Sequence, residues 1–136
     1  MKKLLKIFPL MLLVCCIATI CAACNNQDEH NKITADYAKL HNIDESYVSF
    51  RCYGEFDRTH VLLFDGMYAQ ALSSEIADGI VFCHSQVRTF NVYNDGNFYG
   101  LQEAFNKGLL THDNLLTVRD NHKAENKMLY ANYENN

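Results

Sequence analysis

The side chains of this chain that could do chemistry are scattered histidines, two cysteines and isolated acids. A metal centre needs a second ligand beside a histidine, and a catalytic pair needs a nucleophile beside it. Such a partner would stand about four residues away on a helix or two residues away on a strand. None of the histidines in the folded part has another histidine, cysteine or acid four residues away on a helix or two residues away on a strand. The histidines considered are His60, His84, His112 and His122. The spacing therefore predicts no catalytic, cofactor-binding or metal site.

Cys83 and His84 are adjacent, so on a strand their side chains point to opposite faces and do not form a nucleophile–base pair. Cys83 could still meet His60 across two strands. This possibility supports an alternative interpretation, a small extracytoplasmic hydrolase or thiol-redox protein that uses Cys83 or a histidine. Glu103 has no neighbouring partner that would make it a general acid.

The first residues have the composition of an export signal. Three lysines come first, at Lys2, Lys3 and Lys6, and an apolar run follows. That run is about 14 residues long, whereas a membrane-spanning helix needs about 20. Small residues lead to Cys24, and polar residues follow it at once. We expect a signal peptide over residues 1–23.

The segment from Ile20 to Cys24 resembles the recognition sequence of bacterial lipoproteins, although Cys21 stands where leucine is usual. The resemblance implies that Cys24 carries a lipid such as palmitate and that the membrane is a partner through this anchor. The chain would then lie on the extracytoplasmic face of the cell membrane. Two alternatives stay open: secretion after ordinary cleavage at Ala23, and an uncleaved anchor helix.

The chain that follows the signal is acidic and has about 112 residues, enough for one domain. Without the three signal lysines it has 9 basic and 16 acidic side chains, a net charge of −7. This charge argues against nucleic acid as a partner. The full sequence has eight tyrosines and eight phenylalanines, which suit either an exposed face for a protein or glycan partner, or half-buried strand positions.

Of the six cysteines, only Cys52 and Cys83 belong to the folded part of the chain. Outside the cytosol, two such cysteines are candidates for a disulfide. The alternative is that both are buried free thiols, which behave as small apolar residues.

Apolar periodicity predicts a small α+β domain over residues 32–126, between a tether over 24–31 and a flexible tail over 127–136. An antiparallel sheet of three or four strands should pack with an N-terminal helix and a C-terminal helix pair. Residues 67–74 fit either a helical turn or an irregular crossing, and Gly79 predicts a bulge inside a strand. The expected strands are 47–56, 60–64, 75–84 and 89–93, and a hairpin turn is expected over residues 94–97. The expected helices are 32–41, 101–107, which Gly108 should end, and one that Thr111 should cap.

The C-terminal half contains Asn-Asp-Gly-Asn-Phe-Tyr-Gly-Leu-Gln-Glu-Ala-Phe-Asn-Lys-Gly-Leu-Leu-Thr over residues 94–111. With Tyr53-Gly54 and Asp78-Gly79 upstream, it resembles an uncharacterised family of short exported or lipid-anchored proteins of Gram-positive anaerobes. The resemblance covers residues 47–120 and implies kinship without an activity. Family members often carry Tyr and Thr where this chain has its two cysteines, so a disulfide would be peculiar to this chain.

Within this motif, Phe98, Leu101 and Phe105 have the spacing to pin a helix to the sheet, while Glu103 faces outward. Each residue therefore has a folding role that needs no reaction. The sequence as a whole predicts a surface-displayed, lipid-anchored, non-enzymatic binding or accessory module.

Overall fold

The computed structural model describes residues 27–66 and 71–135 and divides the chain into two compact units, Met1–Glu45 and Ser46–Asn136. The predicted signal peptide and the lipidation site Cys24 lie outside the described residues. In the described ranges 27–66 and 71–135, no helix combines the length and the apolar character that a membrane crossing requires.

The N-terminal unit contains one described helix, residues 27–41. The predicted helix over 32–41 is therefore confirmed, but residues 27–31, expected to be a tether, are already helical. The helix ends at Asn42, whose φ of 53° is left-handed, and the Ile43 N–H donates to the Ala38 carbonyl at 3.0 Å. Asparagine is one of the few residues that accept this conformation readily.

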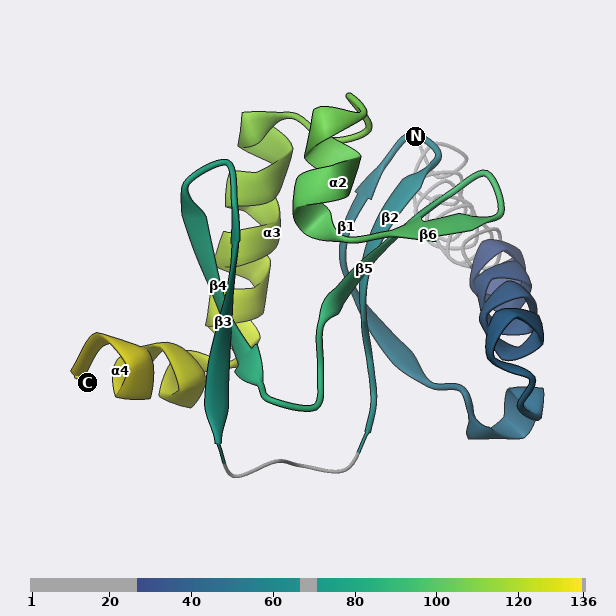
Figure 1. The fold of residues 1–136 in the computed structure, drawn as a ribbon, viewed down its shortest axis with the longest axis horizontal. Helices are drawn as coiled ribbons and strands as arrows, with labels where there is room; N and C mark the ends of the chain where they lie inside the picture. The colour runs from purple at the N-terminus through teal and green to yellow at the C-terminus, as the bar shows by residue number, and fades with distance from the viewer. Residues whose placement is uncertain (1–26, 67–70, 136) are drawn as a thin grey trace, which may run out of the picture. The chain divides into compact units, whose positions relative to one another are not determined.

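The short 3-10 helix η1 (Glu45–Tyr47) spans the boundary between the units. The second unit contains an antiparallel four-stranded sheet in the order β1-β2-β5-β6 (Figure 1). The mixture of helices and antiparallel strands confirms the predicted α+β class. The strands are β1 (Phe50–Phe56), β2 (Thr59–Phe64), β5 (Phe90–Asn94) and β6 (Asn97–Tyr99).

A second sheet consists of β3 (Leu72–Ala77) and β4 (Ile80–Ser85) alone. The prediction of one strand with a bulge at Gly79 was wrong, because the chain reverses there. Asp78 and Gly79 both have positive φ, 50° and 77°, as the two central residues of a tight hairpin turn require. Asp95 and Gly96 form a similar turn between β5 and β6, with φ of 48° and 82°, as predicted.

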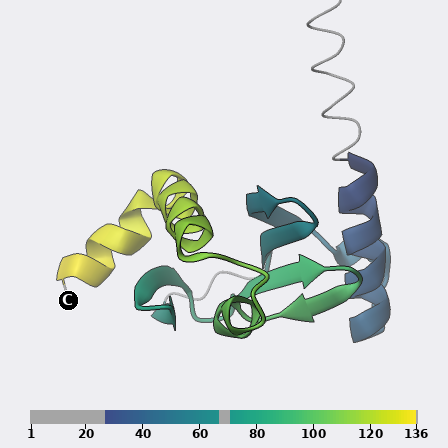
Figure 2. The same ribbon diagram turned by 90° about the horizontal axis from the view of Figure 1, so that it is seen from above.

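Three helices complete the unit: α2 (Leu101–Asn106), α3 (His112–Glu125) and α4 (Lys127–Asn135). The chain leaves α2 through Gly108, whose φ is 78°, and Thr111 caps α3 in a reciprocal capping box with Asn114. Both features agree with the prediction. Residues 127–135 are helical rather than a flexible tail, and Figures 1 and 2 show α4 leaving α3 at a steep angle.

One apolar core joins both sheets to α2 and α3. Leu101 and Ala104 are fully buried in it and hold α2 on the sheets, and Phe105 packs against it while half-buried. Phe98 does not join them as predicted: it pairs with Tyr93 on the other face of the sheet, with ring centroids 5.0 Å apart. The buried core residues are Tyr53, Val61, Leu63, Ala77, Ile80, Phe82, Phe90, Val92, Leu101, Ala104, Leu110, Leu115 and Val118.

Candidate binding cleft

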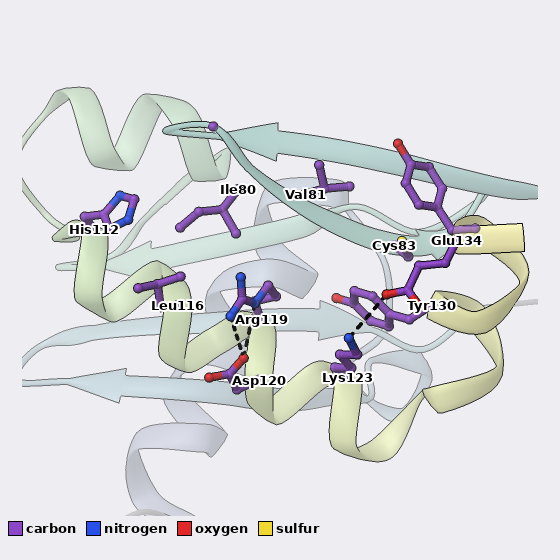
Figure 3. Close-up of a pocket in the computed structure, with 12 residues that line it drawn as sticks. Ile80, Val81, Cys83, His112, Leu116, Arg119, Asp120, Lys123, Tyr130 and Glu134 are labelled. Carbon is purple, nitrogen blue, oxygen red and sulfur yellow. Dashed lines mark hydrogen bonds and ion pairs between the residues drawn. The ribbon is translucent and has the colours of Figure 1, made fainter. Parts of the chain in front are cut away.

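A cleft of about 620 Å³ lies between β4, α3 and α4 (Figure 3). Strand β4 contributes mainly apolar side chains, α3 contributes charged ones, and α4 contributes two tyrosines and a glutamate. The lining residues are Gly79, Ile80, Val81, Cys83, His112, Leu116, Arg119, Asp120, Lys123, Tyr130, Tyr133 and Glu134.

The helical repeat explains why α3 presents its polar groups here. Leu116, Arg119 and Lys123 are three and four residues apart, so they follow one face of the helix. Asn126 ends α3 with non-helical backbone angles, and α4 then turns across the end of the cleft. The turn brings Glu134 to 3.3 Å from the Lys123 ammonium group.

The cleft holds charges of both signs that stay partly exposed. Arg119 donates two hydrogen bonds to one Asp120 carboxylate oxygen, at 3.1 and 2.9 Å. Lys123 pairs with Glu134 and also lies 5.8 Å from the centre of the Tyr130 ring. Such exposed pairs contribute little to stability because water screens them. Their charged groups therefore remain available to a ligand.

Tyr130 fixes α4 to the body of the unit. Its side chain is buried, and its hydroxyl shares a hydrogen bond of 3.0 Å with Nδ1 of His122, which is also buried. Burial raises the pKa of Tyr130 to about 12. Burial, together with the nearby His84 and Arg88, lowers the pKa of His122 to about 4. Both side chains are therefore neutral at pH 7.

Cys83 lies in the floor of the cleft as a buried free cysteine, 1% exposed. Burial and the negative charge of Glu134 raise the pKa of its thiol. A protonated, buried thiol is a poor nucleophile. His84 points away from the cleft, with Nδ1 2.9 Å from the Ser85 carbonyl oxygen and Nε2 3.7 Å from Glu75. The predicted placement of Cys83 and His84 on opposite faces agrees with these contacts.

Cys52 is also a free cysteine, so the two thiols that the sequence offers as candidates for a disulfide are not bridged in this structure. Cys52 belongs to β1 of the four-stranded sheet, and Cys83 belongs to β4 of the two-stranded sheet. His60, the other proposed partner of Cys83, lies on β2. Burial raises the pKa of the Cys52 thiol to about 11, and this thiol donates to the Gly54 carbonyl oxygen at 3.3 Å.

At the opposite end of the cleft, His112 hydrogen-bonds through Nδ1 to the Asp78 carboxylate in the β3–β4 turn. The Asp78 N–H donates to the Gln102 side chain on α2 at 2.9 Å. These contacts hold the hairpin turn against both helices. Glu103, considered as an acid catalyst, is exposed as predicted.

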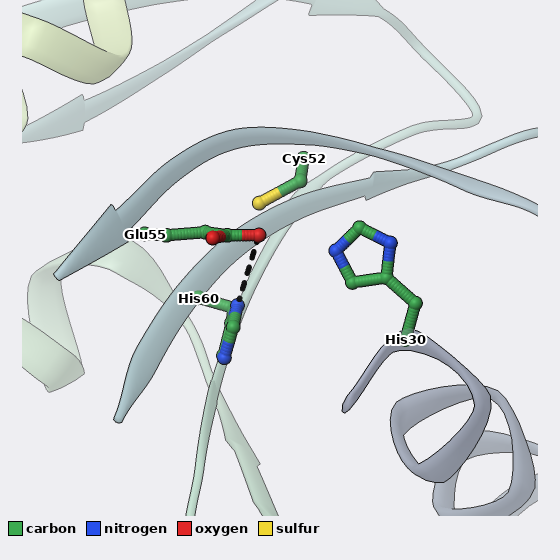
Figure 4. Close-up of side chains that lie close together, drawn as sticks. All are labelled: His30, Cys52, Glu55 and His60. Carbon is green, nitrogen blue, oxygen red and sulfur yellow. Dashed lines mark ion pairs between the residues drawn. The ribbon is translucent and has the colours of Figure 1, made fainter. Parts of the chain in front are cut away.

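Sequence reasoning missed one group of side chains, Cys52, Glu55 and His60 on the β1–β2 hairpin (Figure 4). Their sulfur, oxygen and nitrogen atoms all lie within 4.8 Å of one another. The three ligands come from two paired strands, and the residue spacing within either strand does not reveal them. His30, also drawn in Figure 4, belongs to the N-terminal unit.

Comparison with known proteins gives no match for this chain among protein-family models, curated proteins or solved structures. The chemistry of the chain's own side chains is therefore the basis for inferring its function.

Proposed function

We propose that this chain is a lipid-anchored, non-enzymatic binding module on the extracytoplasmic face of a bacterial membrane. Its binding surface is the cleft between β4, α3 and α4, and its ligand is a peptide segment of a partner protein. The observation that carries the proposal is the combination of tyrosines with arginine and lysine around a cleft of about 620 Å³. Tyrosine and arginine dominate the energetic centres of protein interfaces, and ligand sites generally occupy about 300–1,000 Å³.

The charges favour a peptide over the second candidate, a glycan. Arg119 and Lys123 lie beside Asp120 and Glu134, so the cleft offers donors and acceptors of both signs. A peptide has acidic and basic side chains and a polar backbone that can use both. A neutral sugar could stack on Tyr133 but would make no use of the two cations.

A peptide library displayed on phage and selected on the full chain in detergent tests the proposal. Selected peptides should bind Tyr133→Ala at least tenfold more weakly, because this 42% exposed ring lines the cleft. Tyr47→Ala is the matched control, since Tyr47 is 81% exposed and does not line the cleft. Lys123→Ala should weaken binding as well, with Lys107→Ala, at the residue that follows α2, as its control. Peptides unaffected by both cleft substitutions would refute this surface, and binding on a glycan array alone would favour the glycan.

The anchor is tested separately, through Cys24. Cys24→Ser should abolish incorporation of labelled palmitate and release the chain from membranes. Release of a wild-type chain that begins after Ala23 and lacks lipid would instead support secretion. Membrane retention of the variant with its N-terminus intact would point to an uncleaved anchor.

The enzymatic alternative predicts one fast-reacting thiol. On the binding interpretation, both Cys52 and Cys83 should react slowly with a maleimide at pH 7, because their pKa values are raised. Mass spectrometry of the trapped chain assigns each site. Rapid labelling of Cys83 in the folded chain would support the hydrolase or thiol-redox function instead.

A further inference from the structure

The β1–β2 hairpin gathers three side chains of metal-ligand type on one face. Glu55 and His60 face each other directly across the two strands, and Cys52 pairs with Leu62, two residues beyond His60. Side chains two residues apart on a strand share a face. Cys52 and Glu55 are three residues apart and would normally point to opposite faces.

A β-bulge removes this conflict. The pairing shifts between Cys52 and Gly54, so that Tyr53 is an extra residue on β1. Tyr53 packs into the core beside Val61, on the face away from the group. The extra residue restores Cys52 to the face of Glu55 and His60.

The distances suit a small divalent cation. Zn²⁺ binds sulfur, nitrogen and oxygen at about 2.0–2.3 Å, which places tetrahedral ligand atoms roughly 3.3–3.7 Å apart. His60 Nδ1 lies 3.7 Å from a Glu55 carboxylate oxygen, and the three ligand atoms are all within 4.8 Å of one another. The Cys52 thiol, which donates to the Gly54 carbonyl at 3.3 Å, would exchange this hydrogen bond for the metal.

The ligand types select the cation. Thiolate and imidazole favour Zn²⁺-like transition metals over Mg²⁺ and Ca²⁺, which prefer all-oxygen sites. Binding of the ion would displace the proton of the Cys52 thiol to solvent, and the resulting thiolate and the Glu55 carboxylate would balance the charge of a divalent ion, with the His60 imidazole as the third ligand. Three protein ligands also leave one tetrahedral position for water or an external ligand.

We infer that Cys52, Glu55 and His60 form a tridentate site for a Zn²⁺-class divalent cation on the β1–β2 hairpin. The site is distinct from the cleft between β4, α3 and α4, so it does not depend on the proposed peptide binding.

Cobalt titration of the full chain, reduced, freed of metal and held in detergent, tests the site. One equivalent of Co²⁺ should produce a thiolate-to-cobalt charge-transfer band in the near ultraviolet, and Zn²⁺ should displace it. Cys52→Ser should lose the band. Cys83→Ser is the matched control and should keep it. All other cysteines remain in both variants, so the difference between them isolates Cys52.

Glu55→Gln provides a variant that does not depend on the cysteine. The Glu55 side chain is 35% exposed, so the substitution should be tolerated by the fold. It should keep the charge-transfer band but weaken Co²⁺ binding at least tenfold, and it should reduce the rise in Tm that Zn²⁺ gives the wild-type chain. A band that persists in Cys52→Ser, or a wild-type Tm that Zn²⁺ leaves unchanged, would overturn the inference.

Discussion

The hairpins β1–β2 and β3–β4 carry the same three kinds of side chain in different arrangements. The β1–β2 hairpin has Cys52, Glu55 and His60, and the β3–β4 hairpin has Glu75, Cys83 and His84. The β3–β4 pairing is regular from Leu72↔Ser85 to Ala77↔Ile80. Adjacent residues therefore point apart, and His84 meets Glu75 while Cys83 enters the cleft on the other face.

In the β1–β2 hairpin, one inserted residue gathers all three groups on one face. Tyr53 and Gly54 together lie opposite Val61, and the alternation resumes at Glu55 one step late. Gly54 is needed at the second bulge position, because a Cβ there would lie 2.9 Å from Val118 on α3. The comparison shows that the register of a strand, rather than its composition, decides which side chains can cooperate.

Truncating Tyr53, the extra residue of the β-bulge, should have the largest effect on the free energy of unfolding. Tyr53 is buried, and the centroid of its ring lies 6.1 Å from that of Phe90 and 4.7 Å from that of His122. Tyr53→Ala should lower the free energy of unfolding by about 3–5 kcal/mol, measured by urea titration. Tyr47→Ala, at an exposed position, should change it by less than about 0.5 kcal/mol. A Tyr53→Ala loss below about 1 kcal/mol would show that the bulge does not anchor the hairpin to the core.

The pH dependence of stability depends on both hairpins through His122. The His122 ring packs against Tyr53 of β1, and His84 of β4 contributes to lowering the pKa of His122. The pKa of His122 falls from an ordinary value of about 6.5 to about 4 on folding. The unfolded chain therefore takes up the proton first, and stability falls as the pH drops from about 6.5 to about 4, by up to about 3 kcal/mol.

Urea titrations between pH 7 and 4 measure this loss. His122→Gln should flatten the pH profile, although the variant starts from lower stability. The partly buried Glu75, whose pKa is raised by burial, changes stability with pH in the opposite direction, so the decisive quantity is the difference between the wild-type and His122→Gln profiles. Parallel profiles for the two chains would contradict a neutral buried His122.

Each hairpin contains a glycine, and the reasons for the two glycines differ. Gly54→Ala should destabilise the fold by about 1–3 kcal/mol through overpacking, because its Cβ would lie 2.6 Å from Phe56 and 2.9 Å from Val118. In a Val118→Ala background the additional loss should shrink, as measured by a double-mutant cycle. If Gly54→Ala lowers the free energy of unfolding equally in both backgrounds, contact with Val118 of α3 is not the cause of the destabilisation.

Gly79→Ala should have a smaller effect, about 1 kcal/mol. Its Cβ would meet no heavy atom within 4 Å, but its φ of 77° is unfavourable for alanine. Gly79→Asn should therefore be milder than Gly79→Ala in thermal unfolding, since asparagine tolerates this region. Equal decreases in Tm for the two variants would argue that the positive φ at position 79 is not the cause of the destabilisation.

The smallest effect is expected outside both hairpins, at the exposed Glu103 of α2. Glu103→Gln should change the free energy of unfolding by less than about 0.5 kcal/mol. A loss above about 1 kcal/mol in the same urea titration would contradict a purely solvated side chain.

Local signals predicted the local structure well. Asp95-Gly96 predicted the β5–β6 turn, and Thr111 predicted the cap of α3. Both the turn and the cap depend only on a few neighbouring residues. Asp78-Gly79 carries the same turn signal, but an apolar run on both sides favoured one interrupted strand. At this position the Asp-Gly dipeptide predicts the observed turn, and the hydrophobic pattern does not.

Features that depend on distant partners were not predictable in this way. The helix α4 is rich in asparagine and tyrosine, which are weak helix formers. Its Tyr130 is held by the remote His122. The bulge at Tyr53 likewise depends on Val61 and Val118, and nothing local specifies it. The metal-ligand group follows from that bulge and was missed with it.

The placement of β3–β4 between β2 and β5 also has a consequence for the order of folding. Strands β2 and β5 pair from Thr59↔Asn94 to Leu63↔Phe90, so their first contact closes a loop of about 26 residues. The hairpins β1–β2 and β3–β4 close over two-residue turns, and such hairpins form within about 1–10 μs. We therefore expect the β2–β5 ladder to set the folding rate, with mutations in this ladder slowing refolding more than mutations in either hairpin turn.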